Sequence, residues 1–117
     1  MARLSTHVLD TSRGQPAANV TIDLHALQNG TRRHLKTAVT NFDGRTAEPL
    51  LSGDRIDAGI YELTFHAGPY FRASGIELPD PPFLDEVVVR VGIADPAGNY
   101  HVPLLLAPYG YSTYRGS

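Results

Sequence analysis

The sequence predicts an all-β domain, an antiparallel β-sandwich with one short helix. Apolar residues alternate with polar ones at a period of two through most of the chain, which is the spacing of half-buried strands. The chain carries 11 Gly and 9 Pro among 117 residues, more than an average protein, so it must turn often. The turn-forming residues fall between the alternating stretches at the short intervals typical of a sandwich. Residues 1–117 are expected to form a single domain.

The first half of the chain predicts strands joined by tight turns. In the stretch Val20–Ala26 one face carries only apolar side chains, because successive residues of a strand point to opposite sides. Asn29-Gly30 then marks a hairpin, since a type I′ turn needs positive φ at both central residues. The returning strand is expected to place Leu35, Thr37 and Val39 on one face. The strands expected here are Leu4–Leu9, Val20–Ala26, Arg32–Thr40 and a short edge strand at Leu50-Leu51.

The second half contains the one stretch that favours a helix. In Pro69–Ser74 a proline stands at a plausible first helical position, and Gly75 stands at a plausible stop. The β-branched run Val87–Val91 favours a strand, because branched side chains pack well on a pleated surface. The strands expected in this half are Gly59–His66, Val87–Val91, Tyr100–Ala107 and Tyr109–Tyr114.

Composition excludes several classes of function. With 10 Lys and Arg against 12 Asp and Glu, the formal net charge is -2, so no basic face for nucleic acid or a membrane surface is expected. The chain has no cysteine, which excludes disulfides and thiolate chemistry. No apolar run approaches the roughly 20 residues of a membrane span. The residues Met1–Asp10 lack the features of a secretory signal, so the expected location is cytoplasmic.

Five histidines are the candidates for acid–base chemistry. Their spacing offers none of the close pairs of a local metal site, so no metal is expected. His25, His34 and His66 are interpreted as solvated or hydrogen-bonded strand residues. His7 alternates with apolar neighbours, and His101 begins a strand that is apolar on both faces. Such a strand needs cover on both sides. Two interpretations stay open: a second subunit with His101 near the interface, or an ordinary core strand capped by a histidine.

The end of the chain is unusually aromatic. Tyrosines at positions 109, 111 and 114 carry burial energy that a solvated tail would leave unused. The tail is therefore expected to dock, which would carry Arg115 and the terminal carboxylate of Ser117 into structured surroundings. There a guanidinium can orient anions. The alternative is a solvated tail that does not dock on the domain.

Three segments, together with the last four residues, match one known family. They are Leu4–Thr11, Thr40–Thr46, His101–Leu106 and the ending Tyr114-Arg115-Gly116-Ser117. On these motifs the chain resembles the 5-hydroxyisourate hydrolases, also called transthyretin-related proteins. The resemblance spans nearly the whole chain, and the terminal tetrapeptide is its most specific part. True transthyretins resemble this fold and carry thyroid hormone, but they lack this set of two histidines, an arginine and the ending.

The resemblance implies a transthyretin-like sandwich of two four-stranded sheets, assembled as a homotetramer with active sites in the channel where dimers meet. It implies hydrolysis of 5-hydroxyisourate, the product of urate oxidation, to 2-oxo-4-hydroxy-4-carboxy-5-ureidoimidazoline, with no cofactor. The implied catalytic residues are His7, Arg45, His101 and Ser117. The implied substrate-binding residues are His7, Arg45, Tyr114, Arg115, Gly116 and Ser117. Asn99 departs from the family pattern, in which another histidine often stands at this position.

The chemistry fits these residue types. Opening a lactam with water needs a base, a positive group for the developing oxyanion and an acid for the leaving nitrogen. Imidazoles titrate near neutral pH, and His101 is favoured over His7 as the group that activates the water, although the two could exchange roles. Arg45 is expected to hold the ring carbonyls and stabilise the tetrahedral charge, and Ser117 to position substrate or water.

Two rival hypotheses come from other classes of function. One is a non-catalytic carrier that binds an aromatic small molecule in the tetramer channel. Two imidazoles, Arg45 and a docked carboxylate would be costly in a hydrophobic ligand pocket, which favours the hydrolase. The other is a monomeric adhesion-type module, which a tetramer would exclude.

Overall fold

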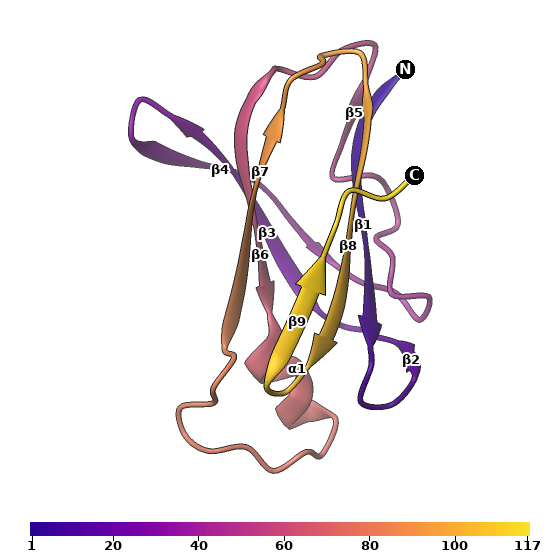
Figure 1. Cartoon of the computed structure of the whole chain (residues 1–117), viewed down its shortest axis with the longest axis vertical. Helices are drawn as coiled ribbons and strands as arrows, with labels where there is room; N and C mark the ends of the chain where they lie inside the picture. Colours follow the sequence, from indigo (N-terminus) through magenta and orange to yellow (C-terminus); the bar gives the residue numbers. More distant parts are fainter.

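Two β-sheets face one another across an apolar core in the computed structural model, which describes residues 1–117 (Figure 1). Every strand expected from the sequence forms, with bounds that differ by at most two residues at either end. The elements are β1 (Ala2–Asp10), β2 (Gln15–Pro16), β3 (Thr21–Gln28), β4 (Thr31–Val39), β5 (Leu51–Gly53), β6 (Gly59–His66), α1 (Ala67–Ala73), β7 (Glu86–Ile93), β8 (Asn99–Ala107) and β9 (Gly110–Thr113).

The predicted sandwich is confirmed, with two differences in its sheets. One sheet has the order β4-β3-β6-β7, and the other has the order β2-β1-β8-β9, with β5 also paired to β1. Strand β2 pairs with Leu9 and Asp10, whereas β5 pairs with residues 2–4. Strand β8 pairs with the other edge of β1. The second sheet therefore has five strands, but β2 and β5 share one edge of β1, so no more than four strands lie side by side at any point along β1. The pairing of β1 with β8 is parallel, and all other strand pairs are antiparallel.

The core lies between the sheets and is built by the inward-facing half of each strand. Leu4 and Val8 of β1 and Leu104 and Leu106 of β8 are fully buried, as alternation along the two strands requires. Their neighbours in sequence therefore point to the other face of this sheet, away from the core. That outward face carries the candidate site.

The predicted side-chain directions in β4 are wrong beyond Leu35. The strand contains a β-bulge: Leu24 pairs with Lys36 while His25 pairs with His34, so Leu35 has no partner. An extra residue shifts the alternation by one position. Ala38 consequently packs against the core, and Val39 is 51% exposed.

The helix α1 begins two residues earlier than the expected Pro69. Pro69 still lies within the first turn, where a missing backbone N–H breaks no helical hydrogen bond. Gly75 has φ +84° and follows the end of the helix, as predicted for a glycine stop. Both Asn29 and Gly30 have positive φ, 52° and 77°, as the hairpin prediction requires. The structure contains no helix with the length and apolarity needed to cross a membrane.

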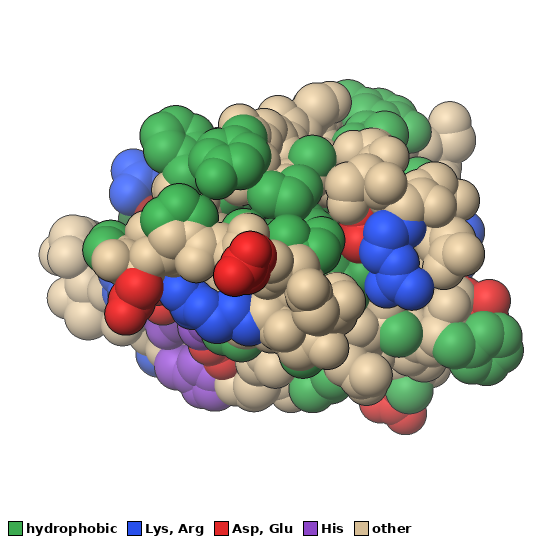
Figure 2. Space-filling model, turned by 90° about the horizontal axis from the view of Figure 1, so that it is seen from below, with side chains coloured by type: hydrophobic (Ala, Val, Ile, Leu, Met, Phe, Trp, Pro, Cys, Tyr) green, Lys and Arg blue, Asp and Glu red, His purple; other side chains and the backbone are tan.

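Apolar side chains also gather on the surface at the end of the sandwich that carries α1 (Figure 2). Phe83 and Tyr109 are two of the exposed apolar side chains, and the centroids of their rings are 6.0 Å apart. Tyr111 and Tyr114, on and just after the edge strand β9, are exposed too. Exposed apolar patches of this kind mark interaction surfaces.

Candidate active site

The parallel pairing of β1 with β8 brings the two candidate histidines together. In this register Ser5 lies opposite His101, and His7 lies opposite Pro103. Residues paired across strands point to the same face of a sheet. The side chains of Arg3, Ser5, His7 and His101 therefore share the outward face, which turns away from the core.

A tight turn attaches Arg45 beside His7. The Asn41 side chain accepts hydrogen bonds from the backbone N–H groups of Asp43, at 2.9 Å, and of Arg45, at 3.3 Å. Gly44 has φ +76° and lies against β1, where a Cβ would collide with the carbonyl oxygen of Val8. The Val8 N–H donates to the Gly44 carbonyl at 2.8 Å. Only glycine fits this approach, and it fixes Arg45 in an isolated β-bridge with His7.

The tail docks, as predicted, but through its backbone rather than through the tyrosines. The N–H of Gly116 donates to the carbonyl of His101 at 2.8 Å, and Gly116 packs so closely that an added Cβ would lie 2.7 Å from the His101 ring. The Arg115 guanidinium lies 4.2 Å from the centroid of the Tyr100 ring. It also donates to the carbonyl of Asn99 at 3.1 Å. In the single chain the three tyrosines are exposed, because β9 is an edge strand with no strand beyond it.

The rings of His101 and His7 have different surroundings. Burial lowers the pKa of His101, and the positive charges of Arg45, His7 and Arg3 lower it further. A lowered pKa favours the neutral form of the His101 imidazole, which is the form that can accept a proton. The His7 ring is held by its Nε2, 2.9 Å from the carbonyl oxygen of Asp43. Since a carbonyl only accepts, Nε2 must carry the hydrogen and Nδ1 keeps the lone pair when His7 is neutral.

A cavity of about 360 Å³ lies over this part of the sheet. Arg45 and His101 line it together with Ser117, so three of the four implied catalytic residues meet there. His7 does not line this cavity but is paired with Arg45 at its side. The full lining is Arg3, Ser5, Arg45, Asn99, Tyr100, His101 and Ser117.

The sequence as a whole matches the model of the HIUase/Transthyretin family over residues 4–116. The chain belongs to the HIUase/Transthyretin family. Curated members are similar over their full length: the 5-hydroxyisourate hydrolase 2 of Rhizobium meliloti is 57% identical over 98% of this chain and 96% of its own. The 5-hydroxyisourate hydrolase of Ralstonia nicotianae is 55% identical over all of both chains.

Solved structures of the family share the fold. The 5-hydroxyisourate hydrolase of Klebsiella pneumoniae has a TM-score of 0.81 at 37% identity and covers all of both chains. A crystal structure of (S)-allantoin synthase has a TM-score of 0.92 at 44% identity, and this chain spans 99% of its own length but 44% of that protein. Sea bream transthyretin in complex with thyroxine has a TM-score of 0.84 at 27% identity, over 97% of this chain and 94% of that one.

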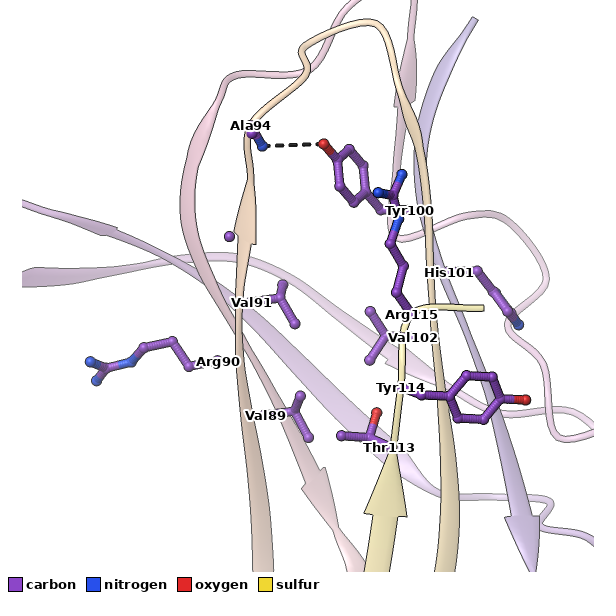
Figure 3. A pocket seen from close by; sticks show the side chains of 11 residues that line it. Val89, Arg90, Val91, Ala94, Tyr100, His101, Val102, Thr113, Tyr114 and Arg115 are labelled. Carbon is purple, nitrogen blue, oxygen red and sulfur yellow. Dashed lines mark hydrogen bonds between the residues drawn. The ribbon is translucent and has the colours of Figure 1, made fainter. Parts of the chain in front are cut away.

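Of the four residues of the terminal motif, only Ser117 lines the cavity over β1 and β8. Tyr114 and Arg115 line a neighbouring cavity of about 390 Å³ between β7, β8 and the tail (Figure 3). In this view Val89 and Val102 point into that space, and the Arg115 side chain runs toward Tyr100. His101 and Tyr100 border both cavities. The cation of Arg115 is thus occupied by Tyr100 and Asn99 rather than directed at the first cavity.

Four residues of the cavity lining were not predicted as site residues: Arg3, Ser5, Asn99 and Tyr100. A signal for the first two was available, because Arg3 and Ser5 stand four and two residues before His7 on one strand and therefore share its face. Their proximity to His101 depends on the register with β8, which no local pattern contains.

The other three histidines lie on the outward face of the opposite sheet. His66 Nε2 is 2.8 Å from Asp23 Oδ2, and His34 Nε2 is 2.8 Å from the hydroxyl of Thr37. The rings of His25 and His34 meet edge to face, 5.3 Å apart. The interpretation of these histidines as solvated or hydrogen-bonded strand residues is confirmed. No group of three or more His, Asp or Glu side chains has the arrangement of a metal site.

Proposed function

We propose that this chain hydrolyses 5-hydroxyisourate to 2-oxo-4-hydroxy-4-carboxy-5-ureidoimidazoline. The observation that carries the proposal is one cavity lined by the imidazole of His101, the guanidinium of Arg45 and Ser117, in a chain 57% identical to a 5-hydroxyisourate hydrolase. In the reaction the oxygen of water bonds to the lactam carbon, the carbon–nitrogen bond breaks, and the leaving nitrogen takes a proton. The product gains a carboxyl group.

His101 is the proposed general base. A base must be unprotonated at the working pH, and the lowered pKa of His101 meets that condition. Its ring borders the cavity, within reach of a water molecule bound there. Proton removal from the water by His101 makes the imidazolium that later returns a proton to the leaving nitrogen, directly or through His7.

Arg45 is the proposed electrostatic partner of the tetrahedral intermediate. Its backbone is fixed by the Asn41 turn and by the bridge to His7, and its side chain lines the cavity. A guanidinium held in place before the reaction stabilises a developing oxyanion without reorganising. Removing one such donor typically lowers the rate by about 100- to 1000-fold.

The tail supplies the remaining wall of the proposed site. Ser117 lines the cavity, and Gly116 is tied to the backbone of His101, so Ser117 cannot move far from the imidazole. For Ser117 we propose a role in positioning substrate or water. For Arg115 we propose a role in holding the tail, because its guanidinium lies on Tyr100 and is hydrogen-bonded to Asn99. For Tyr114, with its exposed ring, contact with substrate stays a prediction.

A homotetramer, a dimer of dimers, is the proposed assembly. Its support is the exposure of two tyrosines along one sheet edge, Tyr111 on the edge strand β9 and Tyr114 just after it. Leu105 points to the outward face of the sheet and is only half-buried, so a second subunit would cover it. Size-exclusion chromatography with light scattering measures the assembly directly, and a monomeric mass would contradict the proposal.

The decisive experiment follows the ultraviolet decay of 5-hydroxyisourate, made in place from urate and urate oxidase. Purified protein should accelerate the decay, and His101→Ala should abolish the acceleration. His25→Ala is the matched control, because His25 lies on the other sheet and should leave the rate unchanged. Decay at the spontaneous rate with folded protein would refute the hydrolase and favour the carrier of an aromatic small molecule.

A further inference from the structure

One ring nitrogen of His101 is held by a serine. Ser5 Oγ lies 2.8 Å from His101 Nδ1, although the two residues are 96 apart in the sequence. Both side chains are half-buried and both line the cavity that Arg45 and Ser117 share. Ser5 is the one side chain hydrogen-bonded to the His101 ring in the structure, so Nε2 is the nitrogen left for the cavity.

We propose that Ser5 is a positioning residue that accepts a hydrogen bond from Nδ1–H of His101 and thereby leaves the lone pair on Nε2. This inference rests on the proposed hydrolysis, in which Nε2 takes the proton from water. A neutral imidazole carries one hydrogen on one of its two nitrogens, and the partner of one nitrogen decides the state of the other. Ser5 would thus select the tautomer that can act as a base.

The charges around the ring give the direction of this hydrogen bond. Arg3 and Arg45 line the same cavity as His101, and the positive charges of both act on its ring. The imidazole of His7, on the same face of the sheet, and the phenol of Tyr100, in the cavity lining, are the other titratable side chains near the ring. A lone pair directed at cations is favourable, whereas an N–H directed at them is repelled. The lone pair therefore belongs on Nε2 and the hydrogen on Nδ1, where Ser5 Oγ is the acceptor.

The position of Ser5 is rigid for a physical reason. It lies in the middle of β1, and the pairing of β1 with β8 runs without interruption from Arg3 to Asp10. Thr6, the next residue, adds a side-chain bond from its hydroxyl to the carbonyl of Val102 at 2.7 Å. A short hydroxyl side chain on such a strand has little freedom, which is the requirement for orienting a catalytic group.

The tautomer itself can be measured on the full-length protein without substrate. Two-bond ¹H–¹⁵N correlation spectra of ¹⁵N-histidine-labelled protein distinguish Nδ1–H from Nε2–H. We expect His101 of the unaltered protein and of Ser5→Thr to show Nδ1–H, and Ser5→Ala to shift toward Nε2–H. Ser112→Ala is the matched control: Ser112 lies on β9, which flanks the other edge of β8, and the change should leave the tautomer alone. An Nε2–H tautomer in the unaltered protein would overturn the proposal.

The pH dependence of kcat/KM provides a readout that a merely structural role would not give. An acceptor at Nδ1–H stabilises the imidazolium more than the neutral ring, so its removal lowers the pKa of His101. In Ser5→Ala the acidic limb of the profile should move to lower pH. The value of kcat should fall about 10- to 100-fold, and KM should change little. This is the range of loss seen when a partner that orients a metal-bound histidine is removed. Ser5→Thr should restore both. A limb that moves to higher pH would mean that Ser5 donates to Nδ1, which contradicts the proposal.

The two measurements separate failure of this inference from failure of the proposed function. A protein that shows the Nδ1–H tautomer but does not accelerate the decay of 5-hydroxyisourate refutes the hydrolase. A protein that hydrolyses the substrate with equal rates in the Ser5→Ala and Ser112→Ala variants refutes the role of Ser5 alone.

Discussion

Gly116→Ala tests how closely the tail must approach His101. An added Cβ at this position would lie 2.7 Å from His101 Cδ2 and 3.3 Å from Pro103 Cγ. An ordinary contact begins at 3.4 Å, so the tail or the imidazole must move by 3.4 − 2.7 = 0.7 Å. A misplacement of about 1 Å at a reacting group can lower the rate by about 100-fold. We therefore expect kcat/KM to fall about 10- to 100-fold.

The stability of this variant should change little, because Gly116 lies in the last residues of the chain, beyond β9. Gly110→Ala is the matched control, since an added Cβ there meets nothing within 4 Å. The assay is the decay of 5-hydroxyisourate under initial-rate conditions, with the melting temperature of both variants measured in parallel. Equal kcat/KM for the two variants would refute the argument that the tail must pack on His101. A large fall in melting temperature for Gly116→Ala alone would assign the loss to folding instead.

Three further predictions concern stability and the chain end. Tyr70→Phe should lower the free energy of unfolding in urea by about 1.5–3 kcal/mol, because the Tyr70 hydroxyl donates at 2.7 Å to Asp10, which is fully buried; an unchanged urea midpoint would contradict this. Hydrogen bonds from Arg90 lower the pKa of Glu62, so its contribution to stability is present above the ordinary carboxyl value of about 4.3 and is lost as the pH falls below it. Urea midpoints of Glu62→Gln should accordingly depend less on pH between about 5 and 3 than those of the unaltered protein, and parallel curves would refute the assignment. A tag fused after Ser117 should remove activity whereas an N-terminal tag should not, and equal activity of the two fusions would exclude the tail from the site.

Local patterns in the sequence determined the elements and the orientation of their side chains. The period-two alternation of Val20–Ala26 and the pair Asn29-Gly30 set a strand and its turn, because side-chain direction and backbone φ are properties of single residues and their neighbours. The same alternation placed His7 and His101 on the face opposite the buried residues of their strands. Family motifs named the residues of the candidate site, three of which line one cavity.

Only the tertiary structure decided which of those faces meet. The hydrogen bond between Ser5 and His101 depends on the parallel register of two strands at opposite ends of the chain, and that register is set by packing across the whole sheet. The bulge at Leu35, which exposes Val39, likewise arises from pairing with β3 rather than from the sequence of β4. The tail is bound through the backbone of Gly116, so its side chains take the directions that their neighbours allow. The Arg115 side chain accordingly lies over the ring of Tyr100. A sequence records side-chain chemistry residue by residue, whereas a site depends on distances between residues that only folding brings together.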